Sequence, residues 1–170
     1  GIDNRGPFLA MNPFSSRCCQ HNHAQGWPYY AEHLILATPD NGVAAAMYAA
    51  CKATVKVGDG NEISLHEQTN YPFEETIRFT VNTPKAVSFP FYLRIPSWTE
   101  GATIFVNGKK VAANPEAGQY ACINREWKDN DQVEIQLPMQ LSMRTWQVNK
   151  NSVSLDYGPL TMSLKMGEDY

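Results

Sequence analysis

The sequence predicts a mainly β protein, an antiparallel β-sandwich preceded by a short loop and helix. Three observations favour this fold class. Val, Ile and Thr are spread along most of the 170 residues, short alternating runs recur beyond residue 42, and turn residues punctuate these runs at regular intervals. The chain also has 11 Gly, 11 Pro and an aromatic content of 11%, a composition that favours strands and turns over long helices.

The N-terminal segment begins as a loop and continues as a helix. Residues 1–17 show no sustained period and are punctuated by Pro and Ser, which is typical of a loop. Pro28 is compatible with the first turn of a helix. The side chains that would share one face of that helix are Tyr29, Tyr30, His33, Leu34 and Ala37. The run Thr38-Pro39-Asp40-Asn41-Gly42 should end it.

Beyond Gly42 the hydrophobic period changes to two, which predicts strands. The expected strands are Val43–Tyr48, Thr54–Val57, Glu62–Leu65, Thr76–Val81, Val87–Ile95, Thr103–Val106, Lys109–Val111, Tyr120–Asn124, Gln132–Leu137, Leu141–Thr145, Ser152–Tyr157 and Leu160–Met166. The Asn107-Gly108 pair indicates a two-residue hairpin turn, because both residue types tolerate positive φ. Short strands without intervening helices favour an antiparallel sandwich over a βαβ fold.

Charge and hydropathy exclude two classes of partner. The net charge is −3 and the 14 Lys and Arg are scattered, so we expect no nucleic-acid interface. No apolar run approaches the roughly 20 residues that span a bilayer, so we expect no membrane segment. The chain opens with Gly1 rather than Met and has no signal-peptide pattern, which suggests a processed or truncated piece.

The most reactive side chains are concentrated between Arg17 and His23. Cys18 and Cys19 are adjacent, and His21 and His23 follow them. A thiolate is a good nucleophile and a good ligand for soft metals, and nearby positive charge lowers the pKa of a thiol. A zinc site usually takes four ligands, of which adjacent cysteines supply two at most. The alternative is that both cysteines pack as small hydrophobic side chains.

Cys18, Cys19 and Asn22 form a Cys-Cys-x-x-Asn motif, and a helix from Pro28 and a Tyr157-Gly158-Pro159-Leu160 run follow it. In these features the chain resembles the C-terminal part of glycoside hydrolase family 127, whose named activity is β-L-arabinofuranosidase. The resemblance implies that residues 1–38 are the tail of a catalytic α/α barrel. It also implies that residues 39–170 form a β-sandwich domain.

The same resemblance implies roles for individual residues. Cys18 would be the nucleophile that forms a thioglycosyl intermediate, and Cys18 and Cys19 would both bind Zn. The acid/base Glu and the remaining zinc ligands would lie upstream, so this fragment alone should be inactive and bind zinc weakly or not at all. The implied substrate of the full-length enzyme is an arabinose-containing glycan.

Weaker candidates surround the motif. His21 and His23 are weaker candidates for contact with a sugar hydroxyl or a metal, and the alternative is that both are structural. Trp27 is a weaker candidate for stacking on a sugar ring, and the alternative is that it packs against its neighbours. Adjacent helical positions diverge by ~100°, so Glu32 and His33 should not face one another. Trp98, Trp127 and Trp146 lie at or near strand ends. They should anchor the core, whereas an exposed Trp there would suggest carbohydrate stacking.

Two other functional classes remain open from the sequence. The chain is alternatively a carbohydrate-binding β-sandwich module or a small structural zinc protein. Metal content and thiol reactivity distinguish them, because a binding sandwich needs neither a metal nor a reactive thiol. We also expect a homodimer through an exposed N-terminal segment. A periplasmic or extracellular location is favoured over a cytoplasmic one by the implied activity, although a metal-bound thiolate must resist oxidation there.

Overall fold

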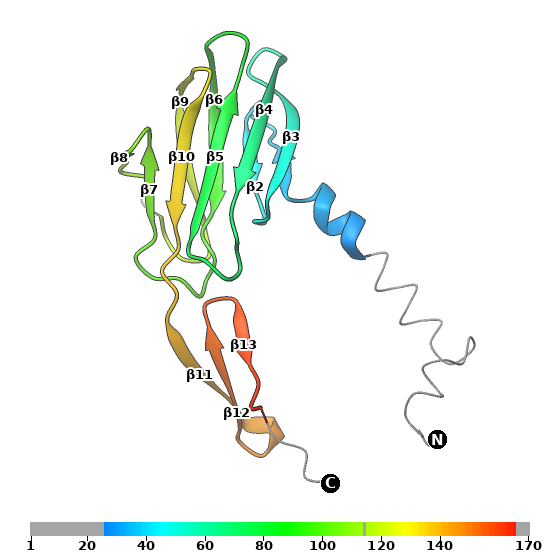
Figure 1. The fold of residues 1–170 in the computed structure, drawn as a ribbon, viewed down its shortest axis with the longest axis vertical. Helices are drawn as coiled ribbons and strands as arrows, with labels where there is room; N and C mark the ends of the chain where they lie inside the picture. Colours follow the sequence, from blue (N-terminus) through cyan, green and yellow to red (C-terminus); the bar gives the residue numbers. More distant parts are fainter. Residues whose placement is uncertain (1–25, 114, 166–170) are drawn as a thin grey trace, which may run out of the picture. The chain divides into compact units, whose positions relative to one another are not determined.

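The computed structural model describes residues 26–113 and 115–165. The chain divides after Leu34 into two compact units. The described part of the first unit contains a helix over residues 26–32, drawn in blue in Figure 1. Its last turn is closed by the backbone N–H of His33, which donates to the carbonyl oxygen of Tyr30 at 3.2 Å. The helix is therefore shorter than the sequence predicts.

The three residues at the end of the predicted helix form a strand instead. β1 (Ile35–Ala37) pairs antiparallel with β2 (Val43–Ala45). The backbone N–H of Thr38 donates to the carbonyl oxygen of Gly42 at 3.1 Å, and Asn41 has a φ of 60°. The turn residues that were expected to end a helix thus close a hairpin, and ladder pairing overrides the local helical pattern. β2 also ends at Ala45 rather than at the predicted Tyr48.

Two sheets form the sandwich (Figure 1). The first has the strand order β1-β2-β6-β9, where β6 is Val87–Arg94 and β9 is Tyr120–Trp127. The second has the order β3-β4-β5-β10-β7-β8. Its strands are β3 (Cys51–Val57), β4 (Asn61–Gln68), β5 (Thr76–Asn82), β7 (Thr103–Val106), β8 (Lys109–Lys110) and β10 (Asp131–Gln136). The predicted antiparallel sandwich is confirmed, with one parallel pair, between β2 and β6, in the described part of the chain.

An aromatic cluster fills the space between the two sheets. Phe79 on β5 packs edge-on against Phe91 on β6, with ring centroids 5.3 Å apart. Trp127 is fully buried and lies against Phe89 and Phe91, and its indole N–H donates to the carbonyl oxygen of Phe89 at 2.9 Å. Trp127 is therefore a core anchor, as its position at a strand end predicts. Trp98 is half-buried against the same core.

The hairpin between β7 and β8 follows the prediction closely. Asn107 and Gly108 have φ angles of 51° and 74°, both in the left-handed region. These values are those of a turn that matches the twist of the flanking strands, which is why Asn-Gly is favoured there.

A separate three-stranded sheet follows the sandwich in sequence. It consists of β11 (Leu141–Trp146), β12 (Ser152–Tyr157) and β13 (Leu160–Met162), with the short helix η1 (Gln147–Asn149) between the first two strands. Its register gathers exposed apolar side chains on one face: Leu141, Met143, Val153, Leu155, Tyr157 and Met162. The opposite face carries an ion pair between Arg144 and Asp156 and a Trp146 ring that is 45% exposed. The described helices include none that is long and apolar enough to cross a membrane.

Candidate functional site

Most of the predicted site lies outside the described residues. Cys18, Cys19, His21 and His23 all precede residue 26. Trp27 is described, and it lies in the helix of residues 26–32 with 62% of its surface exposed. Its ring meets Tyr30 edge-on at a centroid distance of 6.4 Å. Trp27 thus combines packing with exposure, and its predicted role in sugar binding stays a prediction.

Two side chains near the end of this helix lie closer together than predicted. Nδ1 of His33 is 3.7 Å from the carboxylate of Glu32 and donates a hydrogen bond to the carbonyl oxygen of Tyr29 at 2.6 Å. The expectation that Glu32 and His33 point apart was wrong: the helix ends at residue 32, and His33 lies in the turn that follows it. Both side chains are more than half exposed, so the pair is an ordinary surface contact.

Within the described ranges no three side chains of the His, Cys, Asp and Glu types come together in a way that would hold a metal ion. Cys51 on β3 and Cys122 on β9 are both free thiols in separate sheets. Cys51 is half-buried and its Sγ donates to the carboxylate of Glu67 at 3.7 Å. Burial, with the nearby Glu67 carboxylate, raises the pKa of Cys51 to about 11, so this thiol stays protonated at neutral pH.

Glu67 is the buried acid that the sequence analysis missed. It is 1% exposed, at the core-facing end of β4. One carboxylate oxygen accepts the backbone N–H of Ala49 at 3.1 Å, and the other accepts the Cys51 thiol. Desolvation outweighs these two hydrogen bonds and raises the pKa of Glu67 to about 8. The signal in the sequence is the alternation Ile63, Leu65, Glu67, in which Glu67 occupies an inward position.

A second polar pair lies on the outer face of the four-stranded sheet. The hydroxyl of Tyr92 donates to Asp40 at 2.6 Å, and the hydroxyl of Thr38 also donates to Asp40. The hydrogen bond from Thr38, followed by that from Tyr92, lowers the pKa of the exposed Asp40 carboxyl. The Asp40 hydrogen bond in turn raises the pKa of Tyr92. The Tyr92–Asp40 hydrogen bond connects the β1–β2 turn to β6.

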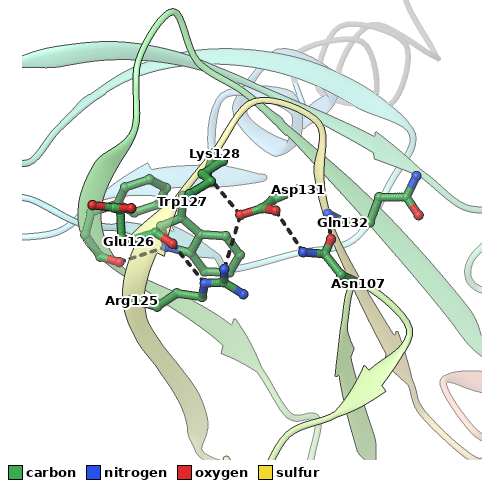
Figure 2. Close-up of polar contacts among 8 residues, drawn as sticks. Asn107, Arg125, Glu126, Trp127, Lys128, Asp131 and Gln132 are labelled. Atoms are coloured by element: carbon green, nitrogen blue, oxygen red, sulfur yellow. Dashed lines mark hydrogen bonds and ion pairs between the residues drawn. The ribbon is translucent and has the colours of Figure 1, made fainter.

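The densest polar network surrounds Asp131, which is buried at the start of β10 (Figure 2). Its carboxylate accepts the backbone N–H of Lys128 at 2.9 Å and the side-chain amide of Asn107 at 2.8 Å, and Arg125 lies 3.5 Å away. Asn107 also accepts the backbone N–H of Gln132 at 2.8 Å. The network joins the β9–β10 turn to the β7–β8 turn. Each charged group is paired, so its geometry explains turn stability rather than catalysis.

Comparison with known proteins identifies the family. The family profile described as "Beta-L-arabinofuranosidase, GH127 middle domain" matches residues 42–139. The chain belongs to glycoside hydrolase family 127. The matched range contains the sandwich from β2 to β10 and ends before the three-stranded sheet of β11 to β13. Among curated proteins, none matches the sequence.

Solved structures support the same assignment to family 127. A GH127 β-L-arabinofuranosidase from Geobacillus stearothermophilus T6 is 31% identical, with a TM-score of 0.78 over 87% of this chain and 24% of that protein. A structure described as a glycoside hydrolase is 34% identical, with a TM-score of 0.65 over 72% of this chain and 21% of the other. A GH127 β-arabinofuranosidase is 26% identical, with a TM-score of 0.65 over 73% and 22%. The chain therefore spans about a quarter of the length of these proteins.

Proposed function

We propose that this family 127 chain carries the nucleophile of a retaining glycosidase that acts on arabinose-containing glycans. The observation that carries the proposal is the family match over residues 42–139, preceded in the same chain by the Cys-Cys-x-x-Asn motif at Cys18, Cys19 and Asn22. Two similar structures are named as β-arabinofuranosidases, which supports the substrate class.

In the proposed reaction the sulfur of Cys18 attacks the anomeric carbon of the sugar. A C–S bond forms as the C–O bond to the leaving group breaks, and a carboxylic acid gives its proton to the departing oxygen. Water then attacks the same carbon, the C–S bond breaks, and the proton of the water passes to the carboxylate. The thiolate of Cys18 and the acid are thereby restored, and two displacements retain the configuration.

The donor set of Cys18 and Cys19 suits zinc, because thiolates are soft ligands that bind this ion well. A bound zinc would supply positive charge that keeps the Cys18 sulfur ionised. Two adjacent thiols give only part of the usual set of four, and the described residues contain no cluster that completes it. Following the family resemblance, the proposal places the other ligands and the acid/base Glu upstream of this chain and expects the chain alone to be inactive.

Cys51 does not fit the role of nucleophile. A nucleophilic thiol needs a lowered pKa, whereas the pKa of Cys51 is raised to about 11 by burial and by Glu67. Cys122 is exposed on β9, in the sandwich. The choice of Cys18 over these two thiols follows from the motif.

The test uses the full-length enzyme that contains this chain and an aryl β-L-arabinofuranoside as substrate. Cys18→Ala should reduce turnover by at least about a thousandfold, as expected for loss of a nucleophile. The matched control Cys122→Ala removes a thiol of the same chain and should leave turnover unchanged. Zinc content measured on both variants reports metal binding independently of turnover. Undiminished activity in Cys18→Ala would remove Cys18 from the mechanism.

A further inference from the structure

Four side chains form a row across the outer face of the six-stranded sheet. Gln68 on β4 is the register partner of Arg78 on β5, Arg78 is the partner of Glu134 on β10, and Glu134 is the partner of Phe105 on β7. Each lies at a position that alternates with core residues of its strand. Because neighbouring strands are ~4.8 Å apart, this cross-strand row spans roughly 14 Å.

Hydrogen bonds fix the polar part of the cross-strand row. Nε of Arg78 donates to one carboxylate oxygen of Glu134 at 2.8 Å, and the amide of Gln136 donates to the other at 2.9 Å. The hydroxyl of Thr103 donates in turn to the amide oxygen of Gln136 at 3.3 Å. Among the described residues neither Nη group of Arg78 has an acceptor, and 61% of this side chain is exposed. The guanidinium thus presents its two Nη groups, with four N–H donors, to solvent.

The cross-strand row lines a hollow of about 350 Å³, to which Gln132 and Gly108 also contribute. Phe105 is half-buried there, on a face whose other members are polar. The Arg78–Glu134 pair alone needs no ligand to explain it, because cross-strand pairs of opposite charge stabilise exposed sheet faces modestly. This stabilising role does not explain why the pair lies in a hollow beside an aromatic ring.

The chemistry of the hollow matches one class of ligand. A sugar ring has an apolar C–H surface that packs on an aromatic face, and its edge carries hydroxyls that both donate and accept hydrogen bonds. Phe105 offers the aromatic face, and the Nη groups of Arg78 offer hydrogen-bond donors. The side-chain amides of Gln68 and Gln132 can each donate and accept a hydrogen bond. The charges of Arg78 and Glu134 cancel at 2.8 Å, which favours a neutral ligand over an anionic one.

We propose that the cross-strand row is a binding site for a neutral oligosaccharide, built on the sandwich and independent of Cys18. It would hold a glycan chain while a separate site cleaves it, and it requires no hydrolytic activity of its own. The inference does not depend on the proposed nucleophile, because none of its residues belongs to the Cys-Cys-x-x-Asn motif.

The test measures binding of the 170-residue chain by calorimetry. The probes are a neutral arabino-oligosaccharide, a neutral cello-oligosaccharide and acidic polygalacturonate. Phe105→Ala and Arg78→Ala should each weaken binding of a neutral probe by about tenfold, as expected when a packing surface or a hydrogen-bond donor is lost. Phe105→Tyr keeps the ring and should retain binding. Tyr120→Ala removes an exposed ring from the other sheet and should have no effect.

The outcomes separate this site from the proposed active site. Cys18→Ala should bind the neutral probe as well as the parent chain does, whatever its effect on turnover in the full-length enzyme. Thermal melting of each variant confirms that the sandwich is folded before binding is compared. The proposal is overturned by absence of binding to both neutral probes, by unchanged binding in Phe105→Ala and Arg78→Ala, or by tighter binding of polygalacturonate than of either neutral probe.

Discussion

Replacing Glu67 by Gln should remove a large pH dependence from the stability of the sandwich. Glu67 is almost fully buried, and desolvation raises its pKa to about 8 despite hydrogen bonds from Cys51 and Ala49. The folded chain therefore holds the acid in its protonated, neutral form at neutral pH. Gln is also neutral and of similar shape, and its amide oxygen can accept the same backbone N–H from Ala49.

The size of the effect follows from the two pKa values of Glu67. In the unfolded chain a Glu has a pKa of about 4.3, well below the value of about 8 in the folded chain. Between these values the folded chain binds a proton that the unfolded chain has lost, so the free energy of unfolding falls as pH rises. The loss is ~1.4 kcal/mol per pH unit, on the order of 5 kcal/mol in all. The stabilisation is complete below pH ~4.3 and gone above pH ~8.

The assay is urea unfolding of the parent chain and of Glu67→Gln at about pH 5.5, 7 and 8. Other acids contribute equally to both proteins, so the difference between their pH slopes isolates Glu67. From the lowest to the highest pH the parent should lose about 3 kcal/mol more than the variant. Glu62→Gln changes an exposed Glu of the same strand and should keep the parent slope. Parallel slopes for the parent and Glu67→Gln would refute the reasoning.

Three further changes probe the packing, the turns and the exposed face. Trp127→Ala should lower the free energy of unfolding by about 3–5 kcal/mol in urea titration, because it empties a fully buried site, whereas Trp146→Ala should change it by less than about 1 kcal/mol. Asp131→Ala should cost about 2–3 kcal/mol in the same assay, because it leaves the partners of a buried carboxylate unpaired. The exposed apolar face of the sheet formed by β11, β12 and β13 should make the chain self-associate, and light scattering measures this association. Leu155→Lys should reduce this association, and Ser154→Lys on the opposite face should not.

The parts of the fold that the sequence predicts are those decided by local pattern. Alternating strands and the Asn107-Gly108 turn depend on neighbouring residues alone. The turn appears where expected, and so do most of the strands, although β2 and β13 end earlier than predicted. The predicted helix includes β1 because Leu34 and Ala37 fit the helical spacing from Tyr29, whereas the pairing of β1 with β2 decides the structure. The parallel pairing of β2 with β6 joins segments more than 40 residues apart, and no local period encodes it.

The candidate sites also differ in whether consecutive residues or strand pairing brings their side chains together. The Cys18-Cys19 motif is visible in the sequence because its residues are consecutive. The cross-strand row is not, because Gln68, Arg78 and Phe105 come from three strands that only the register brings together. Glu67 lies between these cases: its inward position can be read from the alternation, but its partner Cys51 depends on the pairing of β3 with β4.

The core of the sandwich shows why these sites can be tested separately. Every fully packed member of the described core lies between Val43 and Leu137, a range that closely follows the family match over residues 42–139. The described core cluster is therefore formed within the family-matched range. A substitution at Cys18 should remove chemistry without removing the fold, and a substitution in the outer cross-strand row should remove binding without touching the core. The three properties are turnover, glycan binding and folding. A substitution that removes one of them and leaves the other two intact would assign that property to the part of the chain that was changed.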